Sequence, residues 1–451
     1  MDRRIHLREI ATAALERVDP YHMVRRCLRI EDGQLRVTTE RSDHLIPLPN
    51  FSRLLVLGAG KAAAPMAQAV EEILGDRIDT GLIVIKPGHG LVLRRIRSIE
   101  GGHPVPDERS MAAAAEVVAL ADEADEKTLV INLVSGGGSA LLSSPIESST
   151  HPITLAEIQA ATRVLLACGA TIQEINCIRK HLLCLSGGRL AERLFPGTSL
   201  SLILSDVVGD DVQIIASGPT APDATTYAQA CAIVENLDIE SELPASIVGL
   251  LHAGRRGEIP ETPKPGTPPF ARVINVLVGT NLFALEAARR SAEGLGYHAT
   301  VLTSRLVGEA REVAKVLAAI AKDVAAFDLA CAKPACLLAG GETTVTLRGS
   351  GRGGRNQEMA LAYLLEMAGD PQGLGRTSFL SFSTDGEDGP TEAAGAFADA
   401  DLTKRAHEGA LSIPDYLREN DSNGFFMAVD GLLVTGPTNT NVCDIQVVLI
   451  P

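Results

Sequence analysis

The sequence predicts an α/β protein of two domains, on three observations. Short stretches that are apolar throughout alternate with helix-like stretches along most of the 451 residues, as in mostly parallel sheets covered by helices on both faces. The length exceeds that of one ordinary core. Residues 252–271 hold five prolines and no periodicity, which indicates a linker. We therefore expect two non-identical three-layer α/β/α domains with Rossmann-like sheets, over residues 1–251 and 272–451, and a ligand site in the cleft between them.

The expected N-terminal domain begins with a helical pattern over residues 5–18 and continues with five apolar strands. Four of these strands end in glycine together with lysine, histidine, serine or aspartate, and the second has a similar end. Ligands of such sheets bind beyond the carboxyl ends of the strands, so these turns predict a binding site. The strands are residues 53–57, 81–85, 95–99, 128–134 and 199–204, and those of the C-terminal domain are residues 273–278, 298–302, 335–339, 378–383 and 445–450.

The first strand ends in GAGK at residues 58–61 and leads into a helix. A dinucleotide fingerprint has this form, but Lys86 stands where the acidic residue that binds the ribose belongs. Lys86 could contact a 2′-phosphate, so NADP is the one dinucleotide that this turn still allows. A Walker A loop would need an earlier glycine that is absent. A cation in the first turn of a helix opposes the helix dipole. We therefore predict that Lys61 places its charge on a phosphoryl group, with Gly58 and Gly60 in the binding turn.

The fourth strand ends in SGGGS. A serine-hydrolase elbow would need G-x-S-x-G and a histidine–acid partner pattern, and neither is present. A phosphate-binding turn fits better, and a purely structural turn is the alternative. The candidate residues are Ser135, Gly136, Gly137, Gly138 and Ser139.

A Gly/Arg loop, residues 349–355, lies between an alternating strand-like stretch at residues 343–347 and a helix-like stretch at residues 356–366. Four of its seven residues are glycine and two are arginine. Glycines let backbone N–H groups approach a ligand, and a helix start and guanidinium groups favour anions. The loop predicts a site for a phosphorylated ligand; an exposed mobile loop is the alternative. The candidate binding residues here are Gly340, Gly341, Glu342, Gly354 and Asn356.

Aspartates follow two further strands. Asp206 and Asp210 follow the fifth strand and Asp385 follows the strand at 378–383, where one or two carboxylates with phosphate oxygens suit Mg²⁺. Aspartate also forms turns on its own account, so each residue keeps this second interpretation. His103 and His181 are candidate acid/base groups or hydrogen-bonded structural histidines.

Composition narrows the class of protein. The net charge of −15 argues against nucleic-acid binding. The eight cysteines are scattered without C-x-x-C, which predicts free thiols in a reducing compartment and no zinc site. The sequence shows no signal peptide and no membrane-spanning run. We expect a cytoplasmic protein without nucleic-acid or membrane partners, and assembly into a homo-oligomer stays open.

Several motifs resemble the type II glycerate kinases, the MOFRL-domain family whose members have often been labelled hydroxypyruvate reductases. The resemblance covers nearly the whole chain. Two departures are Ser186, where the family often has a basic residue, and Val208, where proline is usual. The motifs are GAGKAA (58–63), GGHPVPDE (101–108), SGGGSALL (135–142), IRKHLLCLSGGRLA (178–191), SDVVGDD with ASGPT (205–220), GGETTVTLRGSGRGGRNQE (340–358), TDGEDGPTEAAGA (384–396) and TGPTNTNV (435–442).

The resemblance implies transfer of the γ-phosphoryl group of ATP, with Mg²⁺, to the 2-hydroxyl of D-glycerate. It implies that Lys61 and Arg355 are catalytic, and it adds Lys180 to the candidate binding residues. Positioning, a metal ion and cations suffice for this chemistry. Two alternatives remain: an NADP-linked hydroxypyruvate reductase, which lacks its acidic ribose ligand here, and a non-catalytic sugar-phosphate sensor, which leaves the aspartate loops unexplained.

Overall fold

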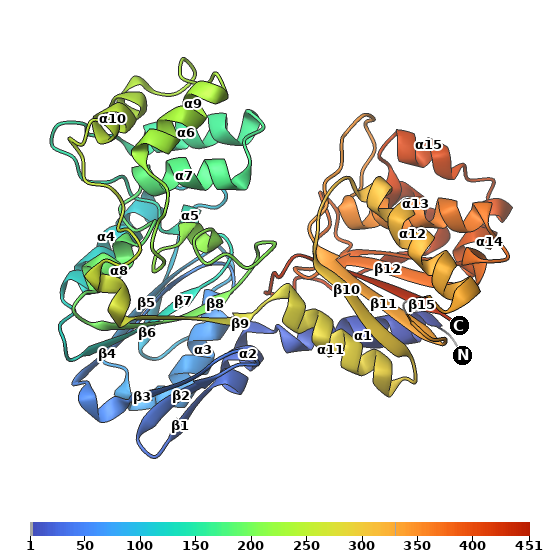
Figure 1. Ribbon diagram of the computed structural model, residues 1–451, viewed down its shortest axis with the longest axis horizontal. Helices are drawn as coiled ribbons and strands as arrows, with labels where there is room; N and C mark the ends of the chain where they lie inside the picture. The colour runs from blue at the N-terminus through green and yellow to red at the C-terminus, as the bar shows by residue number, and fades with distance from the viewer. Residues whose placement is uncertain (1–2, 330) are drawn as a thin grey trace. The chain divides into compact units, whose positions relative to one another are not determined.

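The computed structural model describes residues 3–329 and 331–451, and its chain forms two compact units. The N-terminal unit comprises residues 20–205 and 210–278, and the C-terminal unit comprises residues 3–19, 206–209 and 279–451. Each unit contains a six-stranded sheet with helices on both faces (Figure 1). The α/β class and the two-domain layout are therefore confirmed, while the expected cleft stays a prediction. No helix of the described residues is both long and apolar enough to cross a bilayer.

The sheet of the N-terminal unit has the strand order β6-β5-β4-β7-β8-β9. The pairs from β6 to β8 are all parallel, as the apolar strand patterns predict. α3 covers one face and α4 the other (Figure 1). The elements are β4 (Arg53–Ala59), α3 (Ala63–Leu74), β5 (Thr80–Ile85), β6 (Ile96–Glu100), α4 (Glu108–Asp122), β7 (Thr128–Val134), α5 (Gly138–Leu141), α8 (Arg189–Leu194), β8 (Thr198–Leu204) and β9 (Val273–Gly279).

Two parts of the N-terminal unit lie outside this sheet. α2 (Pro20–Cys27) precedes a small antiparallel sheet of three strands. Four helices form a separate group with its own apolar core (Figure 1), and capping boxes begin three of them. The small sheet has β1 (Leu28–Glu31), β2 (Gln34–Thr38) and β3 (Asp43–Pro47), and the helical group has α6 (Leu155–Ala167), α7 (Ile172–Leu182), α9 (Tyr227–Asn236) and α10 (Ala245–Arg255).

The sheet of the C-terminal unit corrects the expectation of mostly parallel pairing. Its order is β10-β11-β15-β12-β13-β14, and only β10 and β11 pair in parallel. β15 is buried along its whole length, so its apolar run looks like a parallel strand in the sequence although it runs antiparallel to both neighbours. The strands are β10 (His298–Leu306), β11 (Ala335–Gly341), β12 (Ser378–Ser383), β13 (Gly395–Asp399), β14 (Leu432–Leu433) and β15 (Asp444–Ile450).

Helices cover both faces of this second sheet. α1 and α11 pack on one face and α12 and α13 on the other (Figure 1). The strand-like stretch at residues 343–347 is not a strand; it contains one isolated bridge, between Glu309 and Thr344. The helices are α1 (Arg3–Arg17), α11 (Asn281–Gly294), α12 (Ala310–Phe327), α13 (Arg355–Gly369), α14 (Ala400–Glu408), α15 (Ile413–Arg418) and α16 (Ser422–Val429).

The domain boundaries differ from the sequence prediction at both ends. α1 belongs to the C-terminal unit, where its buried Leu7 and Ile10 face that unit's core, and the Thr440 hydroxyl donates to the Val18 carbonyl at 2.7 Å. The proline-rich segment at 252–271 is packed rather than a free linker, because its side chains hydrogen-bond to the helical group. β9 then joins the first sheet, so the chain leaves the N-terminal unit only after residue 278.

Candidate active site

Two glycine-containing turns lie side by side at the carboxyl edge of the first sheet. The parallel register pairs Ala59 of β4 with Val134 of β7, so the turns after these strands are neighbours. The Ser135 amide donates to the Ala59 carbonyl at 3.1 Å, and the Lys61 amide donates to the Gly136 carbonyl at 2.9 Å. The first sheet therefore brings these two strand ends together, and a binding site there stays a prediction.

Glycine is required where the two turns touch. Gly60 has φ +141°, and a Cβ there would lie 2.0 Å from the Ser135 Oγ, closer than any real contact. Gly58 has a similar restriction, with a Cβ position 2.7 Å from the Leu133 carbonyl oxygen. The Ser135 Oγ in turn accepts from the Ala62 amide at 3.1 Å. Gly58, Gly60 and Ser135 thus shape the turns through contacts within the protein.

Positive charge gathers beside these turns without carboxylate partners. Burial and, to a smaller extent, the charges of Lys61 and Lys86 together lower the pKa of His103 to about 4, so His103 is neutral at physiological pH. The ring of His103 lies against Gly137, with its Nε2 2.9 Å from the Cβ position of that glycine. In the described part of the chain neither lysine forms an ion pair. This edge of the sheet therefore presents unneutralised cations.

The second glycine turn is tied to the helical group. Gly137 is the N-cap of α5 and has φ +86°. The Ser139 Oγ lies 2.7 Å from the Ser217 Oγ, and Ser217 donates to the Asn176 Oδ1 at 2.8 Å. Because Asn176 belongs to α7, this chain of hydrogen bonds fixes α7 against the turn. Gly138 is also restricted, with a Cβ position 2.8 Å from the Ala216 Cβ.

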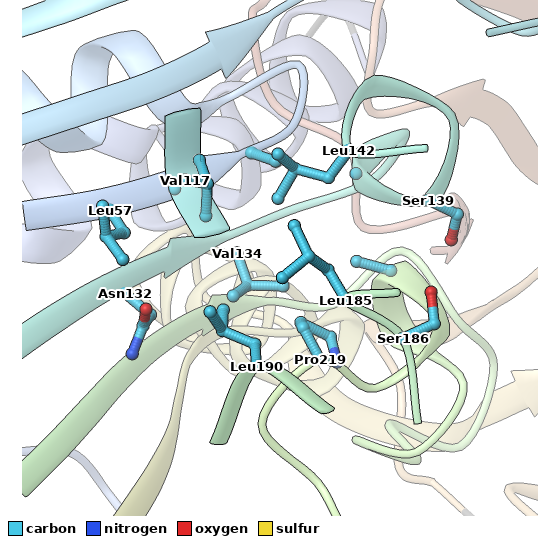
Figure 2. A pocket seen from close by; sticks show the side chains of 14 residues that line it. Leu57, Val117, Asn132, Val134, Ser139, Leu142, Leu185, Ser186, Leu190 and Pro219 are labelled. Carbon is cyan, nitrogen blue, oxygen red and sulfur yellow. The ribbon is translucent and has the colours of Figure 1, made fainter. Parts of the chain in front are cut away.

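An apolar pocket opens beside the same turns (Figure 2). Leu57, Leu142 and Leu185 line it, and Ser139 lies at one side. Asn132 lies at the other side, where its Nδ2 donates to the Ser199 Oγ at 2.8 Å. The Asn132 Oδ1 is buried and has no partner among the described residues. The pocket thus joins an apolar surface to the glycine turns.

The structure gives Lys180 a different environment from the predicted ligand contact. Its side chain is 5% exposed, and its Nζ lies 3.2 Å from Asp223 Oδ1. Burial opposes ionisation of Asp223, but Lys180 and the Thr225 hydrogen bonds outweigh it and lower the pKa of that carboxyl. His181 is likewise buried, bonded to Cys177 O at 2.7 Å. Both side chains hold the helical group together, because partners inside the fold occupy their polar atoms.

The backbone of the Gly/Arg loop is occupied by protein partners. The Gly349 amide donates to the Asn420 Oδ1 at 3.0 Å, and the Gly351 amide donates to the Glu419 carbonyl at 2.8 Å. The Arg352 amide donates to the Asp421 Oδ1 at 3.1 Å. The α15–α16 connection therefore holds the first part of the loop, and phosphate binding by the Gly/Arg loop stays a prediction.

The start of α13 is capped from within. The Asn356 and Gln357 amides donate to the Asp388 carboxylate at 3.0 and 2.9 Å, and a Cβ at Gly354 would lie 2.3 Å from the Asp388 Cγ. Burial raises the pKa of Asp388 to about 6. Gly354 and Asn356 therefore take part in the cap, and an anion site at this helix start stays a prediction.

Arg355 lies between two carboxylates at the edge of the second sheet. Its Nε and Nη2 donate to Asp444 at 2.6 and 2.9 Å, and its Nη1 lies 3.0 Å from the Glu342 Oε1. Asp444 is 1% exposed, Arg355 29% and Glu342 45%. Burial, Asp444, Asp206 and Asp385 raise the pKa of Glu342, against the effect of Arg355. The buried Asp444 thus fixes the guanidinium plane. The more exposed Glu342 is the carboxylate that a ligand can replace at Arg355.

The predicted metal ligands divide between the units. Asp206 belongs to the C-terminal unit, with Asp385, and Asp210 belongs to the N-terminal unit. The Asp385 Oδ1 accepts from the Ser383 hydroxyl at 2.7 Å. Among the described residues, no three His, Cys, Asp or Glu side chains form a ready metal site. Mg²⁺ needs only one or two carboxylates beside phosphate oxygens, and the shared negative charge around Glu342 fits such an ion.

Close packing explains the two glycines that end β11. A Cβ at Gly340 would lie 2.1 Å from the Asn281 Oδ1, and one at Gly341, with φ +148°, would lie 2.2 Å from the Leu306 carbonyl oxygen. Sequence reasoning missed Asp444, whose signal is a charged residue that opens a buried and mainly apolar strand. It also missed Arg179, which lines a pocket of the helical group.

Comparisons with known proteins agree with this organisation. Residues 6–252 match a family described as a domain of unknown function, DUF4147, and residues 335–444 match the MOFRL family. The chain is 38% identical to a glycerate 2-kinase of Pyrococcus horikoshii over 99% of this chain and 97% of that protein. It is 37% identical to the glycerate kinase of Homo sapiens, over 98% and 92%. The crystal structure of a glycerate kinase from Thermotoga maritima superposes with a TM-score of 0.84 at 37% identity, over 98% of both chains.

Proposed function

Because the chain belongs to the type II glycerate kinase family, we propose that it transfers the γ-phosphoryl group of ATP to the 2-hydroxyl of D-glycerate and releases 2-phosphoglycerate. One observation carries the proposal. The turns after the paired strands β4 and β5 contribute Lys61 and Lys86, which no carboxylate neutralises in the described chain, as a site for phosphates and an anionic substrate requires. The relatives are glycerate kinases, and their activity supplies the substrate class.

The roles of the residues follow from their charges. Lys61 places a point charge on a phosphoryl oxygen, and the turn at Ser135–Ser139 bounds the space that the phosphates occupy. Arg355 supplies a planar guanidinium once the phosphoryl group displaces Glu342 from its Nη1, because Asp444 keeps the other nitrogens in place. The cations then neutralise the charge that develops on the transferred group.

Mg²⁺ would be held by Asp385 and Asp206, whose negative charge reaches Glu342. The ion would shield the phosphate oxygens when bound. Excess chelator should therefore abolish turnover, and added Mg²⁺ should restore it. The variant Asp385→Asn should need a higher Mg²⁺ concentration for half-maximal rate at an unchanged melting temperature. Full activity in chelator would remove the ion from the proposal.

A pair of assays tests the activity. The first measures ADP release from ATP and D-glycerate with Mg²⁺, and the second measures loss of NADPH absorbance with hydroxypyruvate. We expect turnover in the first alone. Splitting of a carbon resonance by ³¹P then locates the phosphate, at the central carbon for 2-phosphoglycerate and at the terminal carbon for 3-phosphoglycerate. NADPH oxidation without ATP would favour a reductase, and binding of phosphosugars without turnover would favour a sensor.

A further inference from the structure

A second pocket of the N-terminal unit contains an arginine without an acidic partner. It lies between α5, α6, α7 and the segment at residues 104–106, and its lining includes Arg179, Ser139, Ser143 and Thr162. In residues 3–329 and 331–451 no carboxylate pairs with Arg179, and burial alone lowers the pKa of its guanidinium. Arg179 is half-buried, and a charge held partly out of water without a partner destabilises a fold. The unpaired guanidinium of Arg179 therefore indicates a partner that is not part of the folded chain, such as a bound ligand.

The pocket adjoins the glycine turns. Ser139 lines both this pocket and the apolar pocket beside β4 and β7. The hydrogen bonds from Ser139 through Ser217 reach Asn176, which lies one helical turn before Arg179 on α7. A helix places residues three apart on neighbouring positions of one face. The same contacts that fix α7 against the turn therefore also fix Arg179.

We propose that Arg179 binds the carboxylate of the acceptor substrate, and so selects a small hydroxy acid over a neutral polyol. This inference rests on the proposed function. A guanidinium presents two parallel donors that match a carboxylate, and one cation balances its single charge. A phosphate would need more charge than the pocket provides, because its other walls are prolines, hydroxyls and apolar side chains such as Ile158 and Leu182.

The neighbouring lysine provides a contrast. Lys180 follows Arg179 on α7 but pairs with Asp223 inside the helical group. Of these two adjacent cations, one is neutralised within the fold and the other is left for a ligand. The family motif around residues 178–191 therefore contributes to binding through Arg179, and Lys180 contributes to the support of the helix.

The test compares Arg179→Gln and Arg179→Lys with wild type, and Arg163→Gln serves as the matched control. Arg163 lies on the exposed side of α6 in the same helical group. With ATP saturating, we expect the KM for D-glycerate to rise roughly 10- to 100-fold in Arg179→Gln, as for loss of a charge-assisted hydrogen-bonded pair. The KM for ATP should stay unchanged, the lysine variant should recover part of the loss, and the ratio of rates with D-glycerate and glycerol should fall.

Thermal unfolding supplies a readout that does not need turnover. D-glycerate alone should raise the melting temperature of wild type and of Arg163→Gln but not of Arg179→Gln. The ligand-free melting temperature of Arg179→Gln should equal or exceed that of wild type, because an unpaired, half-buried charge is removed.

Three results would overturn the inference. They are an unchanged KM for glycerate, a rise confined to the KM for ATP, and a D-glycerate shift that Arg179→Gln retains. If wild type does not phosphorylate glycerate, the proposed function fails, and the thermal shift still decides the role of Arg179.

Discussion

The ion pair between Arg355 and Asp444 makes Arg355→Ala a test of stability and catalysis together. Asp444 is 1% exposed and accepts two hydrogen bonds from Arg355, at 2.6 and 2.9 Å. Removing the guanidinium leaves a buried carboxylate without its cation, which costs about 3–5 kcal/mol in the general case. Because Arg355 is 29% exposed, water can enter the vacated space. We therefore expect the lower end, a loss of about 3 kcal/mol in the free energy of unfolding.

The assay follows unfolding and turnover in the same samples. A loss of about 3 kcal/mol lowers the melting temperature by about 6–12 °C, which circular dichroism measures. The kcat for ADP release should fall by about 10²–10⁴, measured well below the melting temperature of the variant. The fall in kcat then reports the lost charge on the phosphoryl group, because the protein is still folded.

A double variant separates the two effects. Arg355→Ala/Asp444→Asn removes both charges, so no unpaired carboxylate is left, and the melting temperature should recover most of its loss. The kcat should not recover, because no cation replaces Arg355. An unchanged melting temperature in Arg355→Ala would refute the reasoning about the buried pair. Recovery of kcat together with the melting temperature in the double variant would refute the catalytic role.

Three further variants test the other features of the candidate site. Lys61→Met should lower kcat by about 10²–10⁴ at an unchanged melting temperature. The control variant Lys127→Met, at an exposed position just before β7, should match wild type. Equal losses of kcat in the two variants would contradict the role of Lys61. Gly60→Ala should lower both the melting temperature and kcat, because its Cβ would lie 2.0 Å from the Ser135 Oγ. Gly88 also has a positive φ, +82°, but has open space around it, so Gly88→Ala should lower the free energy of unfolding by only about 1 kcal/mol. Similar losses in the two variants would contradict the packing argument. The pKa of Asp388 is raised to about 6 by burial from an ordinary value of 3.8, so the fold favours the protonated form; its contribution is complete below the ordinary value and is lost as the pH rises through about 6. The difference in unfolding free energy between wild type and Asp388→Asn should therefore fall by up to about 3 kcal/mol between pH 4 and pH 7, and a flat difference would contradict it.

The sequence was sufficient to predict the strands of the first sheet and the glycine turns at their ends. Strands that are buried on both faces carry a local signal, and parallel pairing brings their carboxyl ends to one edge. The direction of β15 has no such signal, because an apolar run looks alike in either direction. Its insertion between β11 and β12 depends on pairings with residues far away in the chain.

The Gly/Arg loop shows why the remaining site was harder to predict. Glycines suit a phosphate and they suit close packing, and the sequence alone does not distinguish these. The choice depends on the segment after α15, about 70 residues later, which takes the loop amides. Arg179 and Lys180 present the same difficulty on a smaller scale. They point in different directions from one helix, and only the position of Asp223 shows which of them is neutralised.

The membership of α1 in the C-terminal unit has a consequence for the order of biosynthesis. α1 is synthesised before β12 and β15, the strands that it contacts. Its buried Leu7, Ile10 and Ala14 therefore stay without these partners until β15 has been made. A fragment that ends at residue 278 would carry this uncovered apolar helix, and a fragment that begins at residue 279 would lack it. A single cut at this point therefore gives neither unit in complete form, and the synthesis of β15 is the event that completes the second sheet.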